Sequence, residues 1–487
     1  MNPSSSHLDL QAIAKQIMIA HGFEPDFPPE VPQQLARLRA HPPQLTVDAS
    51  VHDLRSLLWS SIDNDTSRDL DQIEVVERLP NGDAKVRVGI ADVDSFAPER
   101  TPIDLHATRE TTTVYAGIRN FPMLPEELST GLTSLLENQD RLSMVIEFTV
   151  AAAGGVSGGQ LYRALVSNKA QLQYNSVGAW LEGKSSAPAK VAASSDLQAQ
   201  LKLQDEIAQG LKKQRFEHGA LTLQTDEVHA LVVDDRVVDV VKQDKNRATE
   251  LIEDFMIAAN GVVARRLENV SSLRRIVRTP ERWDRIVQLA AAKGGKLPAD
   301  PDSKALNDFL VQQKAADPSH FADLSLAMIK LIGRGEYVLE RAGDTAPGHF
   351  GLAVLDYTHS TAPNRRFADL VTQRLIKATL AGQKNPYTDD ELTAIAANCT
   401  LKENAAKKVE REMTKRLAAI AMQHRIGEVF DAIVTGATPK GTFVAVRQPH
   451  LEGLLAQGQK GLDVGDKLRA KLIRTDVQHG FIDFARV

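Results

Sequence analysis

An acidic stretch that leads directly into a strand pattern is the feature that most constrains this fold. Between Ser60 and Val76 the sequence reads SSIDNDTSRDLDQIEVV, which places five carboxylates within twelve residues. The chain continues as QIEVVERL, NGD and AKVRVGIADV, which is the pattern of two strands around an Asn-Gly turn. Because crowded like charges disfavour ionisation, the fold must bring a cation or a cationic side chain to these carboxylates.

Three interpretations of this acidic stretch are open on spacing alone. The first is a solvated loop, which is common for Asp-rich sequence but seldom adjoins buried strands. The second is a calcium loop, although Arg68 replaces the glycine of an EF-hand and a strand pattern follows in place of a helix. The third is a magnesium site, in which a few aspartates leave room for water and a substrate phosphate. The residues on EF-hand ligand positions are Asp63, Asp65, Ser67, Asp69, Asp71 and Glu74.

The magnesium interpretation predicts a phosphate-binding cation elsewhere in the chain. The segment GHFGLAVLDYTHSTAPNRRFADLVTQRL carries Arg365 and Arg366 after an Ala-Pro turn and just before a predicted helix. Guanidinium groups and helix N-termini both bind anions. An arginine pair is also a common structural ion-pair partner, so the pattern alone leaves both roles open.

The pattern along the whole chain predicts an α+β fold in three parts. Residues 1–53 form a short helical region, either helix-turn-helix-like or a cap on the body. Residues 54–424 mix strands and helices and contain the acidic stretch. Residues 425–487 hold five short strand patterns at the spacing of a small closed OB-fold barrel. The expected helices are Leu8–Ala20, Pro32–Arg39, Ala248–Leu267, Phe367–Leu380 and Asp389–Met422.

Composition narrows the classes of function and location. A net charge of −5 gives no overall attraction to nucleic acid, so any polyanion must be bound by locally placed Lys and Arg. The single cysteine, Cys399, excludes an internal disulfide framework and a cysteine-ligated zinc site. We find no secretory signal and no apolar run of roughly 20 residues. We therefore expect a cytoplasmic protein without a membrane partner, and a monomer.

Five ordered blocks between Leu54 and Met422 resemble the catalytic RNB domain of the ribonuclease II family. They are SIDNDTSRDLDQ, GIADVDSF, TTTVYAGIRNFPMLPEELSTGLTSLLENQDRLSMVIE, ATELIEDFMIAAN and GHFGLAVLDYTHSTAPNRRFADL. The tail, from GEVFDAIVTGATPKGTFVAV onward, is similar to the S1-type RNA-binding domain of that family. The resemblance implies a magnesium-dependent, processive exoribonuclease that hydrolyses single-stranded RNA from its 3′ end to nucleoside 5′-monophosphates. Because only about fifty residues precede the acidic stretch, we expect none of the cold-shock domains that most members carry.

The resemblance also implies roles for the site residues. Asp63, Asp69 and Asp71 match three of the four aspartates that serve the metal site, with Asp69 and Asp71 also expected to be catalytic. Arg365 matches the catalytic arginine, which neutralises charge on the phosphoryl oxygens. The fourth aspartate position is Gln72. The chain could recruit Asp65 or Glu74, bind metal with one carboxylate fewer, or bind RNA without cutting it.

Further residues match positions that contact RNA in the family. Tyr115 matches an aromatic that stacks on a base, and Tyr174 matches a tyrosine that holds the 3′-terminal nucleotide. In the tail, Phe430, Phe443 and His450 could stack on bases, with Lys440 attracting phosphate, although Phe443 could equally belong to the barrel core. Asn364 departs from the family, which has an aliphatic residue there. The full set of predicted RNA contacts in the chain is Tyr115, Tyr174, Glu253, Arg366, Glu410, Phe443 and Lys440.

Overall fold

The computed structural model describes residues 9–224, 227–233, 236–243, 245–318, 320–438, 441–446 and 451–487. Its centre is a seven-stranded mixed sheet with the strand order β1-β8-β7-β4-β3-β2-β9. The strands are β1 (Val51–Asp53), β2 (Ser60–Asp63), β3 (Gln72–Arg78), β4 (Ala84–Ala91), β7 (Asp140–Val150), β8 (Val156–Ser167) and β9 (Ala170–Gln173). The predicted hairpin is confirmed as β3 and β4, which pair antiparallel from Gln72 with Ile90 to Arg78 with Ala84.

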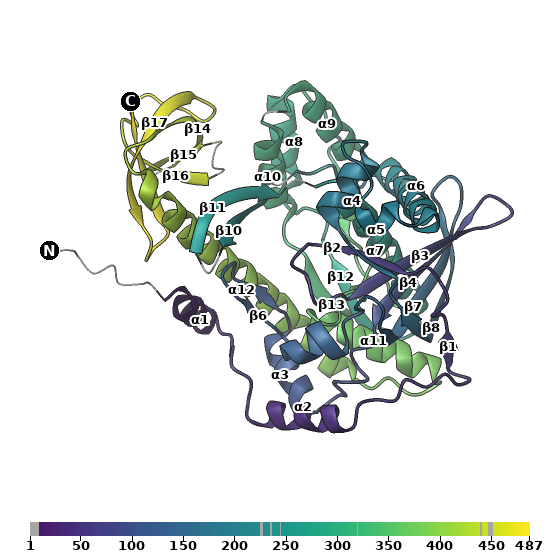
Figure 1. The fold of residues 1–487 in the computed structure, drawn as a ribbon. Coiled ribbons are helices and arrows are strands. Elements are labelled where there is room, and N and C mark those ends of the chain that lie inside the picture. The colour runs from purple at the N-terminus through teal and green to yellow at the C-terminus, as the bar shows by residue number, and fades with distance from the viewer. Residues whose placement is uncertain are drawn as a thin grey trace.

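Helices surround this sheet and complete an α+β body, as predicted (Figure 1). The helix α7 (Arg247–Arg266) packs against β2, β7 and β8, whereas α6 (Ser195–Glu217) packs against β3. The remaining body helices before residue 340 are α3 (Pro102–Glu110), α4 (Tyr174–Leu181), α5 (Ala189–Ala192), α8 (Trp283–Ala292), α9 (Ser303–Ala316) and α10 (Phe321–Ile332). Three antiparallel pairs flank them: β5 (Val114–Tyr115) with β6 (Asn120–Phe121), β10 (Glu227–Val233) with β11 (Arg236–Gln243), and β12 (Ser272–Ile276) with β13 (Glu336–Glu340).

Two helices near the end of the body lead to the C-terminal barrel, and the second of them reaches it. Both α11 (Phe367–Leu380) and α12 (Asp389–Met422) have the bounds that their sequence pattern predicts. A capping box starts α12, because Thr388 Oγ1 accepts a hydrogen bond from the backbone N–H of Glu391 while the Glu391 carboxylate accepts one from the N–H of Thr388. Figure 1 shows α12 running from the body to the barrel, which it contacts through its C-terminal half.

The C-terminal barrel is closed and has five strands, as predicted. Its order is β14-β15-β16-β18-β17. The sequence interpretation of Phe430 as a base-stacking residue is wrong, because its ring is 7% exposed and packs edge-on against Phe484 at 6.2 Å between ring centroids. The strands are β14 (Val429–Thr438), β15 (Gly441–Val446), β16 (Leu451–Gln457), β17 (Lys467–Asp476) and β18 (Phe481–Arg486).

The N-terminal helices, α1 (Leu10–Ala20) and α2 (Glu30–Ala40), pack against different partners. The first lies on α12 and the second on α3, which favours a cap on the body over a helix-turn-helix unit. Figure 1 shows the two helices well apart. None of the helices within the described residues combines the length and the apolar character needed to cross a bilayer.

Candidate active site

The acidic stretch forms a loop between β2 and β3 that is held in place by a turn at residues 133–135. Ser134 Oγ accepts a hydrogen bond from the backbone N–H of Leu70 at 3.0 Å and donates one to the carbonyl of Arg68 at 2.6 Å. The N–H of Leu135 donates to the carbonyl of Leu70 at 3.0 Å. Neutral backbone and hydroxyl groups therefore fix the middle of this loop around Leu70.

The loop meets the arginine segment through Asp71, which is only 2% exposed. Asp71 Oδ1 accepts a hydrogen bond from the backbone N–H of Asn364 at 2.9 Å, and Asp71 Oδ2 lies 3.4 Å from Nε of Arg365. Asn364 is itself buried, and its Oδ1 accepts a hydrogen bond from Thr133 Oγ1 at 2.6 Å. The polar residue that replaces the family's aliphatic one thus joins the arginine segment to the turn that holds the acidic loop.

The two arginines have different surroundings. The side chain of Arg365 is 44% exposed, so it can reach a ligand. Arg366 forms a bidentate pair with Asp369, at 2.8 Å from Nε and 2.7 Å from the terminal nitrogen. Asp369 is completely buried and also accepts the backbone N–H of Ala362 at 2.8 Å. This pairing gives Arg366 a structural task, and its contact with RNA stays a prediction.

Replacing Asp369 with asparagine should therefore destabilise the protein and disorder the arginine segment. The change leaves the Arg366 guanidinium without its buried carboxylate, which typically costs roughly 3–5 kcal/mol. We expect a lower denaturant midpoint in urea unfolding. As a matched control, Asp308→Asn breaks an exposed pair with Lys304 on α9 and should cost no more than about 0.5 kcal/mol. Equal midpoints for the two variants would contradict the structural role.

Tyr115 lies beside the acidic loop on the short strand β5. Its hydroxyl is 3.4 Å from Asp69 Oδ2, and its backbone N–H donates to Glu410 Oε1 on α12 at 3.3 Å. The neighbouring Thr113 N–H donates to the carbonyl of Arg365 at 3.0 Å. With 40% of its surface exposed, the ring is accessible for stacking. The structure thus brings Tyr115, Asp69, Glu410 and Arg365 into one region.

Tyr174 approaches the same region from the first residue of α4. Burial, followed by the negative charges of Asp63 and Glu74, raises the pKa of its hydroxyl, while Arg365 opposes that rise. Glu253 on α7 also acts on Tyr174 and forms an ion pair with Lys245 at 2.6 Å. The adjacent Asp254 is buried and paired with Arg215. Of the two acidic neighbours on α7, Glu253 is therefore the one that acts on the site.

Two carboxyl groups of the acidic stretch, those of Asp71 and Glu74, are buried, and that of Asp63 is partly buried. Burial raises the pKa of Asp71 to about 7, although Arg365 opposes the effect, and burial also raises the pKa of Asp63. The pKa of Glu74 is raised well above its ordinary value by burial and then by Asp63. Three of their oxygens have no hydrogen-bond partner among the described residues: Oδ2 of Asp71 and both carboxylate oxygens of Glu74. Buried carboxylates without such partners are suitable ligands for a hard divalent cation.

These observations exclude two of the three interpretations of the acidic stretch. A solvated loop is wrong, since Asp71 and Glu74 are buried, and an EF-hand is wrong, since the strand β3 follows and Asp65 is exposed. No three His, Cys, Asp or Glu side chains in the described part of the chain stand together as a ready-made metal cage. Magnesium commonly takes one or two carboxylates and completes its shell with water and substrate phosphate. The residues present fit an ion of that kind.

The barrel presents an exposed aromatic that the sequence interpretation missed. Phe481 is 58% exposed and stacks on His479 at 5.6 Å between ring centroids. The alternation in GFIDFARV could have separated it from the buried Phe484. Phe443 is partly exposed and alternates with the buried Thr442 and Val444, so it lies on the outer face of β15. Two further candidates, Lys440 and His450, lie outside the described residues.

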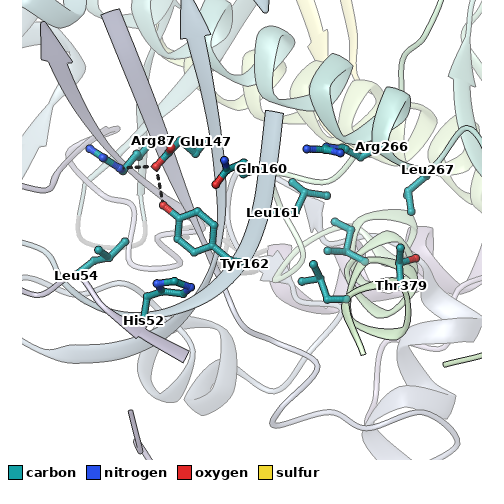
Figure 2. Close-up of a pocket in the computed structure, with 12 residues that line it drawn as sticks. His52, Leu54, Arg87, Glu147, Gln160, Leu161, Tyr162, Arg266, Leu267 and Thr379 are labelled. Atoms are coloured by element: carbon teal, nitrogen blue, oxygen red, sulfur yellow. Dashed lines mark hydrogen bonds and ion pairs between the residues drawn. The ribbon is translucent and has the colours of Figure 1, made fainter. Parts of the chain in front are cut away.

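A pocket of about 590 Å³ lies apart from the acidic loop and the arginine segment, against β7, β8 and α11 (Figure 2). Three of its polar residues bind one another, because Glu147 Oε2 accepts hydrogen bonds from Arg87 Nε at 2.7 Å and from the Tyr162 hydroxyl at 2.9 Å. Its lining, as far as the described residues show, includes none of the predicted site residues. We therefore place the candidate active site at the acidic loop.

Comparison with known proteins identifies two domain models in this chain. The RNB domain matches residues 51–382, and the RNase II-type exonuclease C-terminal S1 domain matches residues 428–487. Ribonuclease R of Thermotoga maritima is 31% identical over 89% of this chain, and ribonuclease R of Escherichia coli K12 is 30% identical over 88% of it. This chain spans only 64% and 54% of the length of those two relatives.

The fold has a solved counterpart. The structure of Mycoplasma genitalium RNase R in complex with ribose methylated single-stranded RNA superposes with a TM-score of 0.86. It is 23% identical, and the match covers 98% of this chain and 78% of that one. At 23% sequence identity, this similarity shows that the two proteins share a fold.

Proposed function

The chain belongs to the RNB family, and we propose that it is a magnesium-dependent, processive exoribonuclease that hydrolyses single-stranded RNA from its 3′ end to nucleoside 5′-monophosphates. One observation carries the proposal. The buried carboxylate of Asp71 lies 3.4 Å from the guanidinium of Arg365, across almost three hundred residues of sequence. A metal-binding carboxylate beside a phosphate-binding guanidinium suits metal-assisted hydrolysis of a phosphodiester.

The residues of the candidate site have different roles in the proposed reaction. Asp63, Asp69 and Asp71 would hold magnesium, which when bound activates the attacking water and stabilises the leaving 3′ oxygen. Arg365 neutralises charge on the phosphoryl oxygens, since its side chain is anchored at one nitrogen and otherwise half exposed. Tyr115 stacks on a base near the 3′ end, and Tyr174 contacts the last nucleotide. Stacking tolerates every base, which suits degradation irrespective of sequence.

The barrel supplies RNA binding outside the site. Replacing Phe443 with alanine should weaken binding of single-stranded RNA by roughly 1–3 kcal/mol, the usual value of one base–aromatic stack. We expect a higher KM and an unchanged rate at saturating RNA, measured with a fluorescent oligonucleotide. A matched control is Val464→Ala, which shortens another exposed apolar side chain of the same domain and should leave KM unchanged. A fall in the saturated rate would instead place Phe443 in the chemistry.

A second candidate function is RNA binding without hydrolysis, which Gln72 favours because an amide is a poor ligand for magnesium. Incubating 5′-labelled single-stranded RNA with the protein and magnesium separates the two candidates. The exoribonuclease shortens the RNA while the label stays on the remaining fragment, and uniformly labelled RNA yields mononucleotides. The RNA-binding alternative gives stable complexes and no metal-dependent product. A chelator should stop the first outcome and leave the second unaffected.

A further inference from the structure

A buried glutamate, Glu74, lies two residues along the strand from Gln72, the position of the missing fourth carboxylate. Gln72 and Glu74 both lie on β3, and side chains at positions i and i+2 of a strand point to the same face. Gln72 carries no negative charge, but the carboxylate of Glu74 is completely buried beside it. The sheet therefore retains a carboxylate on the face where the family has its fourth aspartate.

No hydrogen-bond donor or cation among the described residues binds the carboxylate of Glu74. Neither oxygen has a hydrogen-bond partner among the described residues, and no ion pair in that part of the chain involves it. The polar neighbour Gln204 donates to the Glu74 backbone carbonyl at 3.3 Å and to Ser60 Oγ at 3.5 Å. A side chain that could have bound the carboxylate is thus directed to other groups.

Protonation would remove the charge of this residue but would leave a polar group that needs a partner. A neutral carboxyl group has one O–H to donate, and neither oxygen of Glu74 has a hydrogen-bond partner among the described residues. Buried polar groups normally have partners, so each exception requires an explanation. The carboxylate of Asp63 acts electrostatically on Glu74, and two such carboxylates repel each other unless a cation lies with them.

We propose that Glu74 supplies the charge that Gln72 lacks and that, with Asp63, it holds the divalent ion of the active site. The inference rests on the proposed metal-dependent function, but it concerns metal binding and can be tested without turnover. It assigns Glu74 as a metal-binding residue of this chain at a position that differs from the family's fourth aspartate.

The test is a titration of Mn²⁺ into the RNA-free full chain, by calorimetry and by thermal melting. Glu74→Gln should weaken Mn²⁺ binding by at least about tenfold, the loss that even an outer-shell partner of a metal causes, and should reduce the rise in melting temperature that the ion causes. Without metal the variant should melt no lower than the parent. Glu77→Gln, an exposed change on the same strand, should bind Mn²⁺ like the parent.

A second substitution makes the test independent of the first variant. In the Glu74→Gln background, Gln72→Asp should restore the lost Mn²⁺ affinity. In the parent, the same substitution should change the Mn²⁺ affinity by no more than about threefold. Such a difference between the two backgrounds shows that the two positions serve the same site. A parent that binds Mn²⁺ while Glu74→Gln binds it equally well overturns this inference alone. A tenfold gain from Gln72→Asp in the parent also overturns it, even if Glu74→Gln fails to fold. A parent without Mn²⁺ binding overturns both the inference and the proposed metal dependence.

Discussion

Replacing Asp71 with asparagine should reduce RNA hydrolysis by at least about 10³-fold, while RNA binding is retained. The carboxylate is the group that joins the acidic loop to the arginine segment, through the Asn364 N–H at 2.9 Å and Arg365 at 3.4 Å. Asparagine keeps the volume and can still accept the hydrogen bond from Asn364, but it removes the charge that a divalent ion and Arg365 require. The measurement is single-turnover hydrolysis of labelled RNA at saturating protein.

The same variant has a stability signature that excludes unfolding as the cause. The pKa of Asp71 is raised from 3.8 to about 7 in the folded chain, because burial disfavours the charge. Protonation therefore stabilises the metal-free fold fully below about pH 4, and this stabilisation is lost as the pH rises through 7. Asp71→Asn should consequently melt no lower than the parent at pH 8, with the difference shrinking as the pH falls. An inactive variant that melts far below the parent at pH 8 would contradict this account.

Local patterns explain why much of this fold was predictable. The helices α11 and α12 begin and end where their apolar periodicity and flanking residues indicate, and the hairpin of β3 and β4 follows from an Asn-Gly turn between alternating residues. The strand order of the sheet was not predictable in this way. The pair of β1 with β8 joins residues more than a hundred positions apart, and no local pattern encodes that contact.

The candidate site shows the same division between local and long-range information. Asp63, Asp69, Asp71 and Arg365 could be named from motifs, whereas the burial of Glu74 depends on strands and helices far away in the sequence. Phe430 was misassigned for a related reason. An alternating strand does not say which of its two faces is the core, and in β14 the core side holds Phe430 while Val429 is 38% exposed.

Replacing Arg365 with lysine should lower the rate of hydrolysis on the order of 10²-fold, although the positive charge is kept. Arg365 is anchored by its Nε near Asp71 Oδ2, and this leaves its terminal nitrogens to bind two phosphoryl oxygens at once. Lysine offers a single point charge on a flexible chain and cannot do both. The loss should appear in kcat, because the charge on the phosphoryl oxygens increases only in the transition state.

The neighbouring arginine provides the matched control for this prediction. Arg366→Lys makes the same chemical change one residue away, but Arg366 is committed to the buried Asp369 through two hydrogen bonds. That variant should mainly lower the melting temperature, since lysine cannot reproduce the bidentate pair. Comparing the two variants shows whether hydrolysis depends on a guanidinium at position 365 in particular. If Arg365→Lys hydrolyses RNA at the parental rate while Arg366→Lys loses kcat without loss of stability, the two roles are reversed and Arg366 is the phosphate-binding residue.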